Sequence, residues 1–365
     1  MSVATIAPNK TAAPVPARGT FGQSPNRWLY PLLIVLLVVT TIISTGVGAV
    51  WISPGEVLAI LGNQLGFGLP ADEMKTSIMT VIRLPRVCLG LLIGSGIAVA
   101  GAAMQGLFRN PLADPGLIGI SSGAMLAAVA MIVLKTTLFD QMTELLGYYA
   151  LSLASFVGAC LTSLLVYRVA RVGGRSVVTT MLLAGIAINA LAGSLTGLLT
   201  DMATDEQLRT ITFWTLGSLG GATWTSVLTL LPFVGVVLVG LPRLGGALNG
   251  LALGESQAQM LGVNLVHLKR WVIILAALSV GASVAVAGLI GFVGLVTPHL
   301  IRLVAGADHR RVLIGSALGG AVVLTAADAL ARTVIAPAEL PIGVLTALLG
   351  APVFLWLLIG RRNAS

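Results

Sequence analysis

Long apolar stretches separated by short polar segments run through the chain from residue 28 to residue 359. A helix that crosses a lipid bilayer needs roughly 20 largely apolar residues, and ten stretches match or approach that length. The pattern therefore predicts an all-α, polytopic membrane protein with about ten transmembrane helices. The predicted spans are Trp28–Ile52, Val87–Gly106, Ser121–Leu134, Tyr149–Val169, Val177–Leu199, Thr225–Leu241, Trp271–Ala287, Leu289–Val304, Val312–Ala331 and Gly343–Ile359.

The segment before the first span has a different character. Residues 1–27 are polar and rich in Ala, Pro, Thr and Ser, a composition typical of disordered chains. We expect a disordered cytoplasmic tail over residues 1–27 and one transmembrane domain over residues 28–365. The third and eighth spans are short and lie beside proline and glycine residues, which favours broken or tilted helices at those two places.

The composition excludes an ordinary soluble domain. Of 365 residues, 56% are hydrophobic and 9% are charged, whereas soluble domains carry roughly 25% charged residues. The mean hydropathy is +0.99. Because so few charges cannot cover a water-exposed surface, lipid must solvate much of the chain. The 44 glycines are consistent with closely packed membrane helices.

The charges that remain predict an orientation. With the N-terminus inside, fifteen of the 21 Lys and Arg residues face the cytoplasm and nine of the 13 acidic residues face outward. This is the bias of the positive-inside rule, and it predicts that both termini are cytoplasmic. No basic run is interleaved with aromatic residues, which argues against nucleic acid as a partner. The outer basic residues are Lys75, Arg83, Arg86, Lys135, Arg209 and Arg332.

A short motif occurs twice. Ala98 to Gly101 repeats as Ala285 to Gly288, and in each copy a proline follows ten residues after the glycine. The copies begin in the second and seventh predicted spans, so they would cross the membrane in opposite directions. Chance similarity between Ala- and Gly-rich segments is the alternative. Inverted repeats of this kind are common in transporters, which place their pathway between the two halves.

The loop over residues 248–270 joins the sixth and seventh predicted spans on the cytoplasmic side. Gly254 and Gly262 bracket about two helical turns in which Ala258, Met260 and Leu261 are apolar and the other residues are polar. A short amphipathic helix between glycines can dock into a groove on a soluble partner. A connecting helix that lies on the membrane surface is an equal alternative.

Two further groups of charged residues are candidate functional sites. Arg209 follows Asp205 and Glu206 just outside the fifth span, where it could meet an anionic substrate or an acidic protein surface, or pair with one of these carboxylates. Asp328 lies inside the ninth span with Arg332 four residues later. An intramembrane carboxylate suggests function, but a structural ion pair with Arg332 is the simpler interpretation.

The sequence resembles a known family of membrane transport proteins. Seven stretches, in order from about residue 50 to the C-terminus, are similar to the permease subunits of ATP-binding cassette (ABC) importers for iron–siderophore complexes, haem and cobalamin. Residues 1–27 lie outside the resemblance. The stretches are Arg83 to Arg86, Arg109 to Gly116, Gly254 to Asn264, Gly291 to His299, Asp308 to Arg311, Glu339 to Gly343 and Gly350 to Phe354.

The resemblance implies the type II importer fold, with inverted repeats of about ten helices, in a bacterial inner membrane. It also implies a homodimer, two ABC ATPase subunits on the cytoplasmic side and a periplasmic substrate-binding protein on the other side. Asp205, Glu206 and Arg209 are candidates for the pathway or for docking of the binding protein. The candidate residues for contact with the ATPase are Gly254, Glu255, Ser256, Ala258, Met260, Leu261 and Gly262.

The sequence also lacks the features of an enzyme. No Gly-x-x-x-x-Gly-Lys-Ser/Thr phosphate loop is present, so ATP would be hydrolysed by partner subunits. We expect no catalytic residue, no metal site and no bound cofactor. The outer stretch Leu208 to Gly221 resembles haem importers most, while ferric siderophore and cobalamin stay open as substrates. An ion-coupled secondary transporter that uses Asp328 is the alternative from another class.

Overall fold

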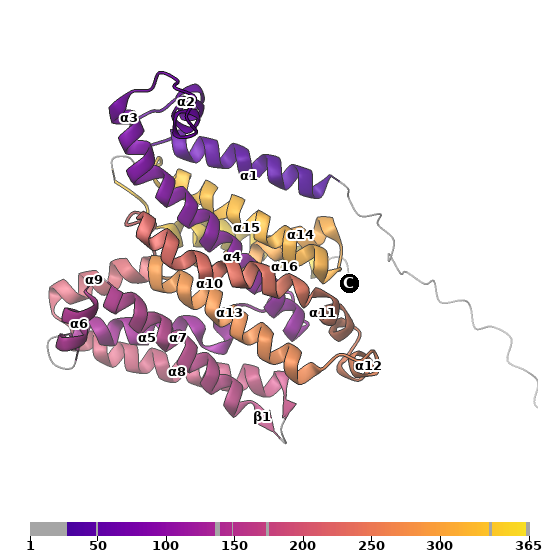
Figure 1. Cartoon of the computed structure of the whole chain (residues 1–365). Coiled ribbons are helices and arrows are strands. Elements are labelled where there is room, and N and C mark those ends of the chain that lie inside the picture. The colour runs from indigo at the N-terminus through magenta and orange to yellow at the C-terminus, as the bar shows by residue number, and fades with distance from the viewer. Residues whose placement is uncertain are drawn as a thin grey trace, which may run out of the picture.

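The computed structural model describes residues 28–48, 50–135, 139–147, 149–172, 175–335 and 338–362. The expected disordered tail, residues 1–27, lies outside these ranges. The described part of the chain is a helical bundle with one pair of two-residue antiparallel strands, β1 (Arg171–Val172) and β2 (Arg175–Ser176) (Figure 1). The all-α prediction is therefore confirmed.

Among the described residues, seven helices are long and apolar enough to cross a membrane, and three further apolar helices accompany them. Together they correspond one to one with the ten predicted spans, although several boundaries differ. The long helices are α1 (Leu29–Gly46), α4 (Leu84–Phe108), α7 (Tyr149–Val169), α8 (Val178–Asp201), α10 (Trp224–Arg243), α13 (Leu265–Ala287) and α15 (His309–Ala331). The other three are α5 (Ile120–Val133), α14 (Val293–Ala305) and α16 (Ile342–Arg362).

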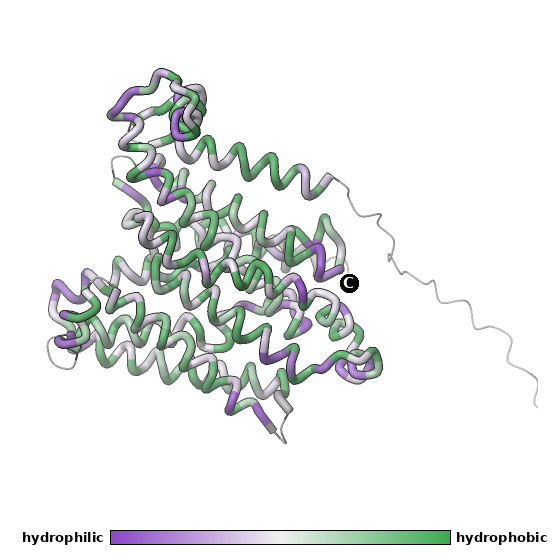
Figure 2. The backbone as a smooth tube through the Cα atoms, viewed as in Figure 1, coloured by the Kyte–Doolittle hydropathy of each residue, from purple (hydrophilic) through white to green (hydrophobic). Residues whose placement is uncertain are grey.

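Small elements occupy the two ends of the bundle. One end carries α2 (Pro54–Gln64), α3 (Glu73–Ser77), α6 (Asp140–Leu146) and α9 (Asp205–Leu216). The opposite end carries α11 (Gly245–Ala252), α12 (Glu255–Met260), the strand pair and the C-terminal end of α16 (Figure 1). The middle of the bundle is mostly hydrophobic, and hydrophilic residues gather at its ends (Figure 2). This distribution is that of a bundle whose middle lies in lipid.

The first predicted span, Trp28–Ile52, is too long. Helix α1 ends at Gly46, and the chain folds back so that the Ile52 N–H donates to the Gly46 carbonyl over 3.1 Å. Ile52 is fully buried beside Val57 and Ile60 of α2. Hydropathy cannot find this boundary, because a buried turn of apolar residues has the same composition as the end of a membrane helix.

The second predicted span, Val87–Gly106, is too short. The helical segment that contains it runs without interruption from Glu73 through α3, a π-helical turn (η1, Ile78–Arg83) and α4, a length of 36 residues. Arg83 and Arg86, which the sequence analysis counted among the outer basic residues, belong to this longer segment, and both side chains are buried inside the protein.

Helix α4 is the centre of the bundle and packs against α10, α13, α14 and α15. Close contact with α15 depends on paired glycines. A Cβ atom on Gly94 would lie 2.2 Å from the Gly320 carbonyl oxygen, and a Cβ atom on Gly320 would lie 2.2 Å from that of Gly94. Only glycine allows two helix backbones to approach this closely.

The two halves of the bundle repeat one arrangement in opposite directions. In the first half a long helix, a short helix and a long helix follow one another (α4, α5, α7), and α13, α14 and α15 do the same in the second. Each short helix packs on the long helix after it, α4 packs on α15, and α13 packs on α7. The motif glycines themselves differ, because Gly101 lies within α4 whereas Gly288 ends α13 with a φ of 72°.

Candidate functional sites at the two ends of the bundle

Helix α12 lies between two glycines with left-handed backbone, as the sequence pattern suggested. Gly254 precedes it with a φ of 123° and Gly262 follows it with a φ of 81°. A Cβ atom at Gly254 would also lie 2.2 Å from the Gln257 side-chain oxygen, so that this flexible side chain would have to move aside. These positions favour glycine and fix α12 as a separate turn of helix.

The apolar residues of this segment divide between the protein and its surface. Ala258 is buried, but Met260 and Leu261 are 88% and 65% exposed. Leu253, just before the first glycine, is 66% exposed as well. Large apolar side chains at a polar end of the molecule are typical of a surface that a partner covers.

A buried lysine fixes α12 to the bundle. Lys269 of α13 donates to Glu255 over 2.8 Å, and only 3% of the lysine side chain is exposed. Beside this ion pair lies a polar hollow of about 530 Å³, which Ser256 and Gln259 also line. The sequence placed Glu255 in the candidate set but gave no sign of its partner, since Lys269 was assigned only to the count of cytoplasmic charges.

The preceding helix, α11, is tied to the start of α15. The Asn249 side-chain amide donates to Asp308 over 2.6 Å, and its oxygen accepts from the His309 backbone N–H over 2.8 Å. Partial burial acts to raise the pKa of Asp308, but the hydrogen bonds from Asn249 and from the Arg310 backbone N–H outweigh it and leave that pKa below its ordinary value. The α11–α12 segment is therefore attached to both α13 and α15.

At the opposite end, α9 displays the candidate docking residues. A capping box between Thr204 and Gln207 starts the helix, and Asp205, Glu206 and Arg209 are all exposed. In the described part of the chain Arg209 forms no ion pair within 4 Å, so the alternative of a surface pair with Asp205 or Glu206 is not formed. This face is charged and open.

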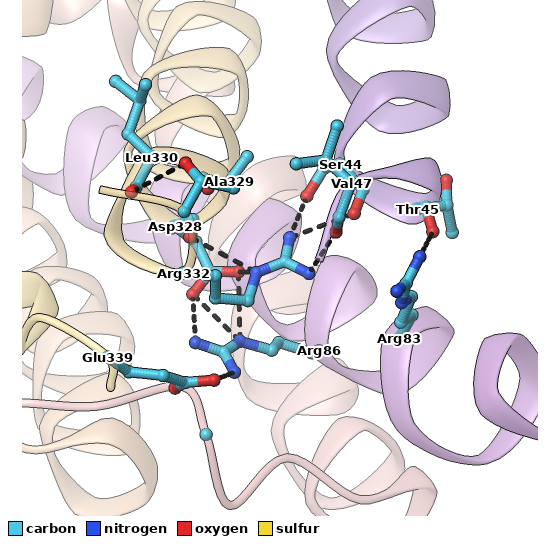
Figure 3. Close-up of polar contacts among 12 residues, drawn as sticks. Ser44, Thr45, Val47, Arg83, Arg86, Asp328, Ala329, Leu330, Arg332 and Glu339 are labelled. Carbon is cyan, nitrogen blue, oxygen red and sulfur yellow. Dashed lines mark hydrogen bonds and ion pairs between the residues drawn. The ribbon is translucent and has the colours of Figure 1, made fainter. Parts of the chain in front are cut away.

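The intramembrane pair that the sequence suggested is part of a larger cluster (Figure 3). Arg332 Nε lies 3.1 Å from Asp328, as the i, i+4 spacing allows. Arg86 of α4 reaches the same carboxylate over 2.9 Å and also donates to Glu339 over 2.8 Å. The hydrogen bond from Arg86 holds the pKa of Glu339, which lies in the loop before α16, below its usual value.

The guanidinium groups of Arg83 and Arg332 donate hydrogen bonds to the last backbone carbonyls of α1. Arg83 donates to the carbonyls of Thr45 and Gly46 over 2.9 and 2.7 Å, and Arg332 donates to the Ser44 carbonyl over 3.0 Å. The last carbonyls of a helix have no partner within it and attract cations. Sequence reasoning missed Arg83 and Arg86 as buried residues. Two signals could have found them: they begin and end one of the stretches shared with the family, and they lie next to a long apolar helix.

This cluster can hold helices together, but it is a poor proton carrier. Two arginines bind the Asp328 carboxylate, so protonation would leave buried cations without their partner, a costly state. Within the described ranges, no group of three or more His, Cys, Asp and Glu residues lies together as metal ligands would.

Comparison with known proteins shows which family has this sequence and architecture. The model of the FecCD transport family matches residues 36–360. The haemin transport system permease protein HmuU of Yersinia pestis is 44% identical over 94% of this chain and 98% of its own length. The vitamin B12 import system permease protein BtuC of Salmonella paratyphi A is 40% identical over 91% and 95%. A metal-chelate type ABC transporter, solved in an inward-facing conformation, covers 91% of this chain and 98% of its own with 32% identity and a TM-score of 0.78.

The bundle is thus that of the membrane-spanning permease subunit of an ABC importer, and it is a transport subunit rather than an enzyme. Membership follows from the extent of these matches. The chain belongs to the FecCD transport family. The family resemblance and the type II importer fold expected from the sequence are confirmed. Members of such systems work with ATPase and substrate-binding partners.

Proposed function

We propose that the chain is the permease of a haem importer. The observation that supports this substrate is the 44% identity to the Yersinia haemin permease across almost the whole chain. The 40% identity to the cobalamin permease makes cobalamin the competing substrate, with ferric siderophores as a third. The test is uptake of each compound into vesicles that hold the chain, its ATPase and its binding protein. Cobalamin or siderophore uptake without haem uptake would contradict the assignment.

The energy source is ATP hydrolysed by partner subunits, and the chain itself needs no cofactor. Reconstituted in vesicles with the ATPase and the binding protein, it should import substrate only when ATP is present on the side of the membrane where the ATPase subunits lie. A catalytically inactive ATPase is the matched control. Uptake driven by a proton gradient with the ATPase absent would instead support an ion-coupled secondary transporter.

Glu255 and the exposed residues of α12 carry the contact with the ATPase in this proposal. Their support is the exposed Met260 and Leu261 beside a hollow, on a segment attached to both α13 and α15. Replacing Glu255 and Met260 together by alanine should weaken binding of the ATPase or separate ATP hydrolysis from transport. Met74→Ala is the control, because Met74 is 69% exposed at the other end of the molecule. Normal assembly and uptake in the double variant would remove this role.

On this assignment the end with α11 and α12 is cytoplasmic, both termini lie there, and the membrane is the bacterial inner membrane. The charge bias of the sequence supports this orientation. The face of α9 with Asp205, Glu206 and Arg209 then meets the periplasmic binding protein or the substrate. Reversing the charge of Arg209 with Arg209→Glu should lower affinity for the binding protein and make the remaining affinity less dependent on salt. An unchanged affinity would exclude α9 from the contact.

The complete transporter is a homodimer of this chain with two ATPase subunits. Helix α8 supports the proposal, because 22% of its apolar window is buried within one chain and Leu183, Ile186 and Leu198 are each more than 60% exposed. A second copy would cover part of this face. Mass measurement of the assembled complex in a native detergent micelle should give two copies of the permease. A complex that contains one copy of this chain and one different membrane subunit would contradict it.

A further inference from the structure

Helices α7 and α13 pack side by side, and two hollows lie along their contact, the first of which α10 also lines. The one near the end with α9 has a volume of about 220 Å³ and is lined by residues such as Leu153, Phe156 and Phe233. The one near the end with α12 has a volume of about 270 Å³ and is lined by Leu164, Ile274 and Leu278. Both hollows open on the apolar surface of helices that have the length and composition of membrane spans.

The two hollows differ in charge. The surface that lines the first is entirely apolar, and no charged residue lines it. The second has one charged residue, Arg270, in the second turn of α13. Trp271 follows and is 42% exposed, with its ring centroid 5.9 Å from that of His267. Tryptophan at a helix end marks the depth of the lipid headgroups, so Arg270 lies where phosphate groups lie.

Two further arginines lie at or just beyond the end of α7 that lines this second hollow. Arg168 follows the lining residue Tyr167 at the end of α7, and Arg171 begins the strand pair, whose second strand packs against α13. Arg168, Arg171 and Arg270 are exposed, and none has a carboxylate within 4 Å among the described residues. Their neighbour Lys269 is neutralised by Glu255. The arginines leave unbalanced positive charge beside an apolar hollow.

We propose that this second hollow, between α7 and α13, is a binding site for one anionic phospholipid. An acyl chain occupies the space beside Leu164 and Ile274, and the phosphate lies against Arg270, with Arg168 and Arg171 adding positive potential. Basic pockets between membrane helices on the cytoplasmic side bind anionic headgroups in this way. The absence of charge in the lining of the other hollow predicts that only the cytoplasmic leaflet supplies such a lipid.

The charge on the site selects the occupant. A second copy of the chain would bring its own three arginines to the same line, and like charges without acidic partners repel. Free phosphate would satisfy the arginines and leave the apolar hollow unfilled. An anionic lipid satisfies both parts of the site.

The test uses the purified full chain in detergent with phosphatidylglycerol or phosphatidylcholine of identical acyl chains, and native mass spectrometry counts the lipids retained. We expect selective retention of phosphatidylglycerol and about a fivefold loss of it in Arg270→Gln, the factor that one interfacial arginine supplies. Arg243→Gln is the matched control. Arg243 is the last residue of α10, is exposed at the same end of the bundle as Arg270, and does not line the hollow. Thermal unfolding of each variant checks that the fold is intact.

Filling the hollow is an independent test. Ile274→Trp should lower phosphatidylglycerol retention, whereas Val286→Trp in the other hollow should leave it unchanged. Equal retention of both lipids by the wild type, or no effect of Arg270→Gln, would overturn the proposal. Displacement of the lipid by inorganic phosphate would overturn it too. Cross-linking gives a last test. In a background without Cys88 and Cys160, a disulfide between two Leu164→Cys chains would also overturn the proposal, because a second copy would then cover the site.

Discussion

The Asp328 carboxylate forms ion pairs with Arg86 and Arg332, although only 2% of its side chain is exposed. A charge in this position is tolerated because both arginines that contact it have further partners, Arg86 in the loop before α16 and Arg332 on α1. Removing one member of a buried ion pair leaves the others desolvated and unpaired, which costs far more than loss of an exposed pair.

Asp328→Ala should therefore lower the free energy of unfolding by about 3–5 kcal/mol. Glu339→Ala is the comparison, because Glu339 pairs with the same arginine but 45% of its side chain is exposed; its cost should be within about 1 kcal/mol. Thermal unfolding in detergent measures both. Equal costs for the two variants would show that burial does not control the strength of this cluster.

At the end of the bundle with α2, Glu56 has an unusual acidity. The hydrogen bond from Lys75, at 2.5 Å, and that from the Ser53 backbone N–H, at 2.7 Å, lower the pKa of Glu56 from 4.5 to about 2. A carboxyl group whose pKa is lower in the folded state stabilises that state above its unfolded pKa. The contribution is lost as pH falls toward 2.

The link between α2 and α3 should accordingly loosen between about pH 4.5 and pH 2. Hydrogen exchange of the α2 amides at a series of pH values reports this loosening directly. Glu56→Gln removes the titrating group, so its α2 exchange should already be fast at neutral pH and show no further acid-dependent step. An acid step of the same size in that variant would assign it to another carboxyl group.

These residues also show what the sequence could reveal. The i, i+4 spacing of Asp328 and Arg332 was enough to suggest their pairing, because helix geometry is local. Arg86 is 242 positions away from Asp328 in the chain. Its contact depends on how α4 and α15 pack, and no pattern within one helix contains that information.

At the level of helices, α4 and α15 depend on the absence of side chains at Gly94 and Gly320. A methyl group there would lie against the opposite backbone, which cannot move aside as a flexible side chain can. Gly94→Ala should therefore separate the two helices and lower stability by about 1–3 kcal/mol. Thermal unfolding in detergent is the measurement.

Gly235→Ala provides the control for this prediction. Gly235 lies in the middle of α10, and a Cβ atom added there would meet nothing within 4 Å. Since alanine has the higher helix propensity, this variant should be neutral or slightly stabilising. A stabilising effect of Gly94→Ala as well would mean that the helix contact adapts without cost.

Helix boundaries were the weakest part of the prediction from sequence. The existence of ten apolar helices followed from composition, but α1 ends six residues before Ile52 and α4 continues a helix that begins at Glu73. Helix α9 gave no apolar signal, because Asp205, Glu206 and Arg209 lie within it. Such elements form through caps and tertiary contacts rather than hydropathy.

For the whole molecule, the assigned orientation has a direct test. In a background with Cys88 and Cys160 replaced by alanine, Met260→Cys should react with a membrane-impermeant thiol reagent only from the cytoplasmic side. Phe67→Cys, 71% exposed at the opposite end, should react only from the periplasmic side. Labelling of both positions from one side would contradict the orientation proposed from the charge bias.

Helix α15 is held at both of its ends. Near its start, Asp308 and His309 hold Asn249 of α11, and at its end Asp328 and Arg332 hold α4 and α1. A rod clamped at two points can bend between them but cannot slide along its axis, since sliding would break directional bonds at both clamps together. A displacement of α11 should therefore reach the Asp328 cluster as bending of α15 rather than as movement of the helix along its axis.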